Sequence, residues 1–151
     1  VILLKIPVVG TLARSIYITR FAENLSALLA GGIPVVRALI IVSEVIGNHV
    51  FTSIILKAAD EVRSGGTMST VFLRSQEIPP MVSQMIRIGE ETGSLSTVLG
   101  STAKFYNQEV ETMTKSLTTL IEPILIVVLG VGVGILVVGV LLPIYNIAGQ
   151  L

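Results

Sequence analysis

The stretch LTTLIEPILIVVLGVGVGILVVGVLL, residues 117–142, is the most apolar part of the chain. Residues 124–142 are 19 consecutive Ile, Leu, Val or Gly residues, and no charged residue follows Glu122. At about 1.5 Å per helical residue, such a run extends roughly 28 Å, close to the thickness of the hydrocarbon part of a bilayer. Signal peptides have shorter apolar cores and lie at the N-terminus. The sequence therefore predicts a transmembrane helix over residues 117–145, followed by a short tail at 146–151.

The charged side chains all precede the uncharged run that begins at Pro123. The chain of 151 residues has 10 basic and 10 acidic side chains, all between Lys5 and Glu122, which predicts a mixed-charge domain outside the bilayer. This balance gives no support to a nucleic-acid-binding surface. Cysteine is absent, which excludes a disulfide framework and a thiolate metal site. The chain begins with Val rather than Met, which indicates a piece of a longer protein.

The flanks of the predicted span indicate its orientation. Lys104 and Lys115 precede it, whereas the nine residues after Leu142 are uncharged. Positively charged flanks stay in the cytoplasm, so we expect the domain in the cytoplasm and the C-terminus outside. Tyr145 stands where an interfacial aromatic residue is expected.

Residues 15–116 show helical patterns separated by Gly and Pro. Residues 1–14 are apolar but too short to span a bilayer and are broken by Pro7 and Gly10. They could be the end of an earlier membrane helix, a membrane-proximal approach segment, or a segment that merely packs on the domain. From Ser15 on, six helices are expected, with boundaries at Gly31-Gly32, Gly47-Asn48, Gly65-Gly66-Thr67, Pro79-Pro80 and Gly93-Ser94. The short connections predict an all-α fold, a compact antiparallel bundle whose last helix continues into the membrane.

Apolar residues at helical spacing give the expected inward faces of the first five helices, and in the last helix the same spacing continues into the predicted membrane span. They are Phe21, Leu25, Leu28 and Leu29; Val35, Leu39, Val42 and Ile46; Phe51, Ile54, Ile55, Ala58, Ala59 and Val62; Met68, Val71, Phe72 and Leu73; Met81, Val82, Met85, Ile86 and Gly89; and, in the last helix, Leu95, Val98, Leu99, Thr102, Tyr106, Val110, Met113, Leu117, Leu120 and Ile121.

Residues that could carry catalysis are few. The chain has one His and one Asp, so a catalytic triad would need His49 together with Asp60 or a Glu. The position of His49 at a helix start favours a surface or capping role. Lys115-Ser116 lacks the glycine of a P-loop, and the glycines of the apolar stretch do not form G-x-G-x-x-G. We therefore expect no enzyme activity, no cofactor and no metal.

Two features of the apolar stretch suggest contacts. Gly130 and Gly134 form a small-xxx-small pair, which lets another helix approach closely, although glycine is also common in membrane helices. Glu122 precedes Pro123 near the expected membrane boundary. A carboxylate at this depth is expected to have a partner or a functional role; alternatively, its side chain extends to the membrane interface. Pro123 removes one backbone hydrogen bond of the helix and can kink it.

Glu90 and Glu91 are adjacent carboxylates in the stretch RIGEETGS, residues 87–94. Adjacent residues of a helix point about 100° apart, so the two cannot chelate a cation unaided. A solvated turn, with Glu90 paired to Arg87, is the favoured interpretation.

An ordered set of motifs resembles the second cytoplasmic domain and last membrane helix of the inner-membrane platform proteins of type II secretion systems and type IV pilus machines. These motifs are Pro7-x-x-Gly10-x-Leu12, Arg20-Phe21, Leu25, Leu28-Leu29, Gly32-Ile33-Pro34, Ala38-Leu39, Gly65-Gly66, Pro79-Pro80-Met81, Gly89-Glu90-Glu91-Thr92-Gly93-Ser94-Leu95, Glu122-Pro123 and Pro143-Ile144-Tyr145. Members of this family carry two such domains and about three membrane helices, so the resemblance implies the C-terminal part of such a protein.

The resemblance implies a non-enzymatic scaffold that couples a cytoplasmic assembly ATPase to the insertion of pilin or pseudopilin subunits. It further implies self-association and contacts with other inner-membrane assembly components. The turn at Gly89, Glu90 and Gly93 would fix the geometry of the last two helices. Glu122, Pro123 and the Gly130–Gly134 face would meet neighbouring spans or a pilin. The competing interpretation is a membrane-anchored helical adaptor or signalling domain unrelated to pili.

Overall fold

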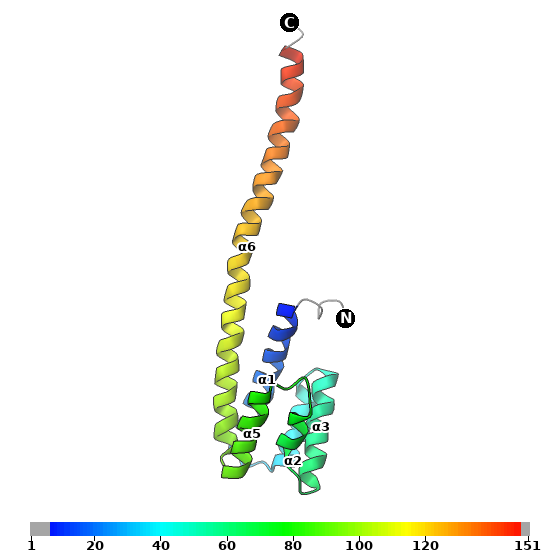
Figure 1. Ribbon diagram of the computed structural model, residues 1–151, viewed down its shortest axis with the longest axis vertical. Helices are drawn as coiled ribbons and strands as arrows, with labels where there is room; N and C mark the ends of the chain where they lie inside the picture. Colours follow the sequence, from blue (N-terminus) through cyan, green and yellow to red (C-terminus); the bar gives the residue numbers. More distant parts are fainter. Residues whose placement is uncertain (1–6, 149–151) are drawn as a thin grey trace. The chain divides into compact units, whose positions relative to one another are not determined.

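A computed structural model describes the backbone of residues 7–148 and the side chains of this range except those of residues 7–9, 117, 120 and 141–148. The described backbone is all-α, as predicted, and contains no strand (Figure 1). Its helices are α1 (Pro7–Ala30), α2 (Val35–Val45), α3 (His49–Arg63), α4 (Met68–Leu73), α5 (Pro80–Thr92) and α6 (Leu95–Ala148). The chain divides into two compact units, Val1–Glu111 and Thr112–Leu151, with the division inside α6.

Helix α1 begins at Pro7 rather than at Ser15 and runs through Gly10, so the prediction that Gly10 breaks this stretch was wrong. Proline is tolerated at the first helical position, because the N–H that it lacks would have no partner within the helix. Gly10 lies inside α1, where glycine costs about 1 kcal/mol relative to alanine and does not by itself end a helix.

Two predicted helix boundaries are confirmed by their hydrogen bonds. Gly32 has φ of +81°, which glycine adopts without steric cost, and the amide of Ile33 returns to the carbonyl of Leu28. Asn48 caps α3, because its Oδ1 accepts hydrogen bonds from the backbone N–H groups of Val50 (2.9 Å) and Phe51 (3.2 Å).

The core of the first unit is built from the inward faces of α1 to α5 and the first turns of α6. Its buried apolar residues are Ile18, Phe21, Ala22, Leu25, Ala38, Leu39, Val42, Ile46, Phe51, Ile55, Ala58, Ala59, Met68, Phe72, Ile78, Val82, Ile86, Leu99, Ala103 and Tyr106. The rings of Phe21 and Phe72 meet edge to face, with centroids 5.4 Å apart. This contact anchors the short helix α4 on α1.

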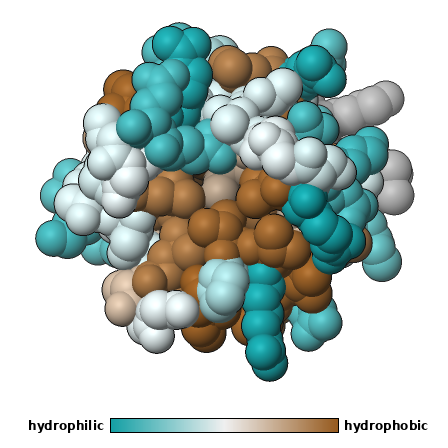
Figure 2. All heavy atoms as spheres, turned by 90° about the horizontal axis from the view of Figure 1, so that it is seen from below, coloured by the Kyte–Doolittle hydropathy of each residue, from teal (hydrophilic) through white to brown (hydrophobic). Residues whose placement is uncertain are grey.

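Leu73 and Met81 were predicted to be buried and are instead exposed, at 48% and 44%. Helix α4 buries Met68, Ser69 and Phe72, which directs Leu73 outward. Helix α5 similarly turns Ser83 inward beside Val82 and Ile86, which leaves Met81 on the outer face. Figure 2 shows that hydrophobic side chains gather on part of the surface, with hydrophilic ones at many points around its edge.

Helices α1 and α6 are joined by two reciprocal hydrogen bonds. The Ser26 hydroxyl donates to the Ser96 carbonyl (2.7 Å), and the Ser96 hydroxyl donates to the Ser26 carbonyl (3.1 Å). Gly100 lies close by, since a Cβ atom added there would be 3.3 Å from the Ser26 Oγ. The two helices therefore approach closely where their side chains are small.

The second unit consists of the remaining part of α6, whose described residues between 121 and 140 are all exposed. Among the described residues, α6 is the one helix that is long and apolar enough to cross a membrane. The hydroxyls of Ser116, Thr118 and Thr119 donate to carbonyls one turn earlier, so these polar groups are paired within the helix before the apolar run begins.

Candidate interaction site

The turn between α5 and α6 is built around two glycines. Helix α5 ends at Gly93, as predicted, with φ of +66°, and the amides of Gly93 and Ser94 both return to the carbonyl of Gly89. A Cβ atom added at Gly89 would lie 3.0 Å from the Cα of Leu95 and 3.3 Å from the Cβ of Val98. The absence of a side chain at Gly89 therefore lets the start of α6 pack directly on the end of α5.

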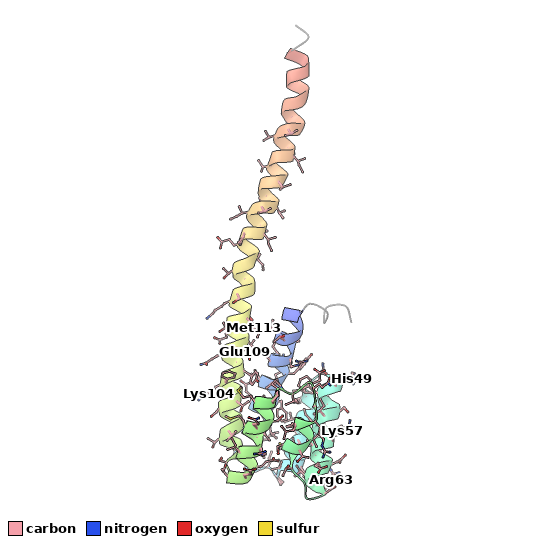
Figure 3. All side chains as sticks on the ribbon, viewed as in Figure 1. His49, Lys57, Arg63, Lys104, Glu109 and Met113 are labelled. Atoms are coloured by element: carbon pink, nitrogen blue, oxygen red, sulfur yellow. The ribbon has the colours of Figure 1, made fainter. Side chains whose placement is uncertain are left out.

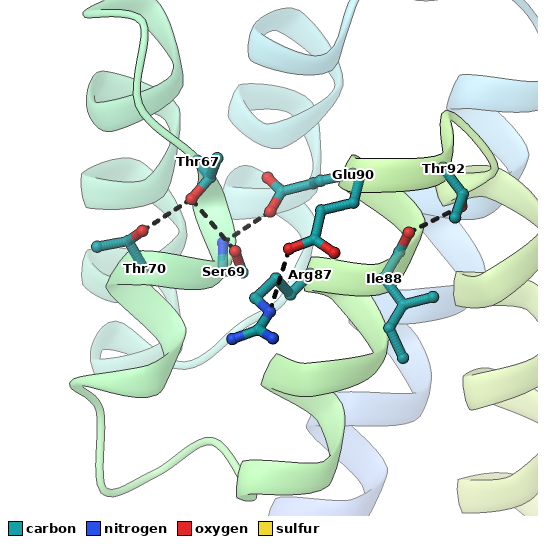
Figure 4. Close-up of polar contacts among 8 residues, drawn as sticks. Thr67, Ser69, Thr70, Arg87, Ile88, Glu90 and Thr92 are labelled. Carbon is teal, nitrogen blue, oxygen red and sulfur yellow. Dashed lines mark hydrogen bonds and ion pairs between the residues drawn. The ribbon is translucent and has the colours of Figure 1, made fainter.

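Glu90 links α5 to the N-terminus of α4 (Figure 4). Its Oε1 accepts a hydrogen bond from the backbone N–H of Met68 (2.8 Å). Its Oε2 accepts one from the backbone N–H of Ser69 (3.3 Å), the bond drawn in Figure 4. The first amides of a helix have no partner within it, and a carboxylate is a strong acceptor for them. Glu90 therefore acts as a capping residue supplied by another helix.

The pairing of Glu90 with Arg87 that the sequence suggested is wrong. Arg87 pairs with Glu91, with the Arg87 Nε 3.3 Å from the Glu91 Oε1, and both side chains are exposed. Thr67 stands at the predicted boundary before α4, where a threonine can cap a helix, but its side chain makes no capping hydrogen bond to α4. The Thr67 hydroxyl is bonded to the hydroxyls of Thr70 and Ser69 instead (Figure 4).

Other candidate residues do not assemble into a reactive group. Within the described part of the chain, no cluster of three His, Asp or Glu side chains could hold a metal ion. His49 is exposed at the start of α3, at the edge of the bundle in Figure 3. Asp60 is engaged with Arg63, at 2.9 Å.

The residues of the apolar helix that were predicted to make contacts are exposed to the surroundings. Glu122 and Pro123 are exposed, and the helical backbone continues through Pro123. Cβ atoms added at Gly130 or Gly134 would meet no described atom within 4 Å. This face therefore leaves room for a second helix to approach along the glycines.

Besides the contacts of Glu90, two further long-range contacts were not predicted from the sequence. Arg14 of α1 pairs with Glu77 before α5 (3.0 Å), and Ser26 pairs with Ser96 as described above. These partners are 63 and 70 positions apart, and helical periodicity carries no information about such pairs.

Comparisons with known proteins agree on one family. A family model described as "Type II secretion system (T2SS), protein F" matches residues 21–143. The type IV pilus assembly protein PilC of Thermus thermophilus is 41% identical over 149 residues, which cover 98% of this chain and 37% of that protein. The type IV pilus assembly protein TapC of Aeromonas hydrophila is 39% identical over 145 residues, which cover 96% of this chain and 35% of the relative.

Relatives named for secretion match as well. Type II secretion system protein F of Pseudomonas aeruginosa is 35% identical over 145 residues, covering 96% of this chain and 36% of its own length. The chain thus spans little more than a third of the length of these relatives. The family matches most of the chain, which confirms the resemblance deduced from the motifs. The chain belongs to the type II secretion system protein F family, which includes the type IV pilus assembly proteins PilC.

Proposed function

We propose that this chain is part of a non-enzymatic inner-membrane platform of a type IV pilus or type II secretion machine. Its relatives are named for pilus assembly and for type II secretion. The observation that carries the proposal is a helical bundle whose last helix continues into a segment with residues 121–140 all exposed. A continuous apolar surface of that length is stable only when lipid or other apolar helices cover it.

In this proposal the bundle, residues 15–116, lies in the cytoplasm, residues 117–145 cross the membrane and residues 146–151 lie outside. Residues 1–14 approach the membrane. The support comes from the charges, because Lys104 and Lys115 precede the span and no charge follows it.

The platform couples a cytoplasmic assembly ATPase to the insertion of pilin or pseudopilin subunits, and it self-associates and contacts other inner-membrane components. Such a role requires contacts that hold their geometry under load. The close α5–α6 turn at Gly89 and Gly93 and the Glu90 link to α4 support it, because they fix three helices relative to one another.

Glu122, Pro123 and the glycines Gly130 and Gly134 form the membrane part of the proposed site. The glycine positions are open to a neighbouring span or a pilin helix. A carboxylate near the membrane boundary is costly without a partner, so Glu122 would pair with a basic or hydrogen-bonding group of that neighbour.

Photo-crosslinking in cells tests the proposal. A photoreactive residue is placed in turn at Glu91, Asn107 and Val131 of the full-length protein, and the captured proteins are identified. We expect an assembly ATPase from the bundle positions, and a pilin or a second copy from Val131. Capture of none of these in cells that are building filaments or secreting would favour the adaptor interpretation.

Assembly assays test the membrane part separately. We expect Glu122→Gln and Gly134→Leu each to reduce pilus or pseudopilus assembly, while the protein level in the membrane stays unchanged. Gly132→Leu serves as a control for added volume, because Gly132 lies outside the Gly130–Gly134 face. Normal assembly in both variants would refute a contact at this face.

A further inference from the structure

Residues 112–123 of α6, which we call the α6 neck, join the packed part of the first unit to the apolar run at 124–142. The division between the two compact units falls at the start of the neck, between Glu111 and Thr112. Among the described side chains of the neck, Met113 (labelled in Figure 3) is half-buried and the others are exposed. The stiffness of this segment therefore depends mainly on the hydrogen bonds of the helix itself.

The first part of the neck is rich in hydroxyl side chains. Five of the eight residues 112–119 are Ser or Thr. The hydroxyls of Ser116, Thr118 and Thr119 donate to the carbonyls four residues earlier, at 2.9, 3.0 and 3.0 Å. In an α-helix these carbonyls also accept the backbone N–H groups of the same residues. Hydroxyls bonded in this way often bend helices.

These hydroxyls lower the cost of a bend. When a helix bends, the backbone hydrogen bonds on its outer side lengthen. In the neck, a carbonyl that loses its N–H donor keeps its hydroxyl donor, and the exposed position of the neck lets water pair with the freed N–H. A bend in the neck thus leaves fewer polar groups without a partner than the same bend in a helix without hydroxyls.

Pro123 weakens the other end of the neck. Proline has no N–H, so the carbonyl of Thr119 has no backbone donor within the helix, and the proline ring crowds the preceding turn. Sharp bends of helices occur most often at proline. The weakest part of the hydrogen-bond ladder therefore lies between Ser116 and Pro123.

The glycines of the apolar run are a less favourable place for a bend. Gly130, Gly132 and Gly134 also lower the helix propensity. However, residues 124–142 contain no hydroxyl side chain, and in a bilayer no water is present to pair with an opened backbone group. The neck is thus favoured over the glycines as the point of bending.

We propose that the α6 neck is a hinge, which lets the bundle change its direction while the span keeps its place in the membrane. The proposal rests on the membrane span of the proposed function and adds a conformational device to it. A rigid helix would force the span to tilt whenever a cytoplasmic partner turns the bundle. The hinge separates these two motions.

Distances between pairs of spin labels, measured by electron paramagnetic resonance on the full chain in lipid nanodiscs, test the hinge. The chain has no Cys, so labels can be placed at introduced cysteines alone. Glu44→Cys with Ile135→Cys forms a pair across the neck, and Glu44→Cys with Lys104→Cys forms a pair within the first unit; all three positions are exposed. We expect the distance distribution across the neck to be about twofold wider than the one within the unit.

A stiffened neck should remove this difference. The variant Ser116→Ala/Thr118→Ala/Thr119→Ala/Pro123→Ala removes the three hydroxyls and restores the missing N–H. Because alanine has the highest helix propensity, the distribution across the neck should narrow to about the width of the one within the unit. The pair within the unit, measured in every variant, shows whether the bundle stays folded.

Two control variants locate the effect. Ser101→Ala removes a hydroxyl that donates to the carbonyl of Thr97 (3.1 Å) in the same way, but in the packed part of α6. Gly132→Ala raises the helix propensity between the neck and the label at Ile135. Both variants should leave the width across the neck unchanged.

Three results would overturn the inference. They are a distribution across the neck as narrow as the one within the unit, a width that the stiffened neck leaves unchanged, and a narrowing by Gly132→Ala as large as that by the stiffened neck. The measurement requires neither an assembly ATPase nor a pilin. The hinge and the platform role can therefore fail separately.

Discussion

Replacing Glu90 with Gln should destabilise the bundle, because its carboxylate accepts hydrogen bonds from the amides of Met68 (2.8 Å) and Ser69 (3.3 Å). A glutamine keeps one acceptor oxygen but sets an NH₂ group against the other amide. Bonds to a charged acceptor are worth about 1.5–3 kcal/mol and helix caps about 0.5–2 kcal/mol. We expect a loss of about 1–2 kcal/mol, or roughly 5–12 °C in melting temperature for a unit of about 100 residues.

Glu91→Gln is the matched control, since it makes the same chemical change one residue away. It removes an ion pair with Arg87 in which the side chains are 60% and 64% exposed. Exposed pairs at i, i+4 contribute about 0.3–0.5 kcal/mol, so the melting temperature should fall by no more than about 4 °C.

The assay uses the full chain in detergent micelles. Thermal unfolding followed by circular dichroism gives the stability, and hydrogen–deuterium exchange gives the location of the effect. In Glu90→Gln the amides of Met68 and Ser69 should exchange faster than in the parent chain, whereas in Glu91→Gln they should not. Equal melting shifts in the two variants, or unchanged exchange at α4 in Glu90→Gln, would refute the capping role.

Four further predictions concern the same bundle. Gly89→Ala should cost about 1–3 kcal/mol in thermal unfolding, because the new Cβ would lie 3.0 Å from a backbone atom of α6. Asn48→Ala should cost about 1 kcal/mol and Thr67→Ala less, because the side chain of Asn48 caps backbone amides and that of Thr67 does not. Ser83→Ala should raise the melting temperature, since the Ser83 hydroxyl is buried with no hydrogen-bond partner in the described part of the chain. Burial, and secondarily the charge of Glu109, raises the pKa of Tyr106 above its ordinary value of 10.0. The free energy of unfolding should therefore fall as pH rises above 10, and it should fall less in Tyr106→Phe. Denaturant titrations at several pH values check this.

Much of the local structure could be predicted from the sequence. Helix ends depend on residues close to the boundary, such as Asn48, whose side chain accepts from the amides of Val50 and Phe51, and Gly93, which accepts a positive φ. The same applies to the apolar end of α6, where length and composition alone define the segment.

The contacts of Glu90 could not be predicted in this way. In sequence, Glu90 and Glu91 are equivalent neighbours of Arg87, and local spacing favoured Glu90 as its partner. The packing of α4 on α5 decides otherwise, because it brings the amides of Met68 and Ser69, 22 and 21 positions away, to the Glu90 carboxylate. Long-range packing also buries Met68 and Phe72 and thereby turns Leu73 outward.

The contact between α1 and α6 at Ser26 and Ser96 consists of two hydrogen bonds, each with its own donor and its own acceptor. Each hydroxyl donates to the other residue's backbone carbonyl, which every amino acid possesses. Replacing either serine by alanine therefore removes one bond and leaves the acceptor of the other intact. The contact can therefore lose its hydrogen bonds one at a time, and the loss of either hydroxyl leaves the two helices connected by the other bond.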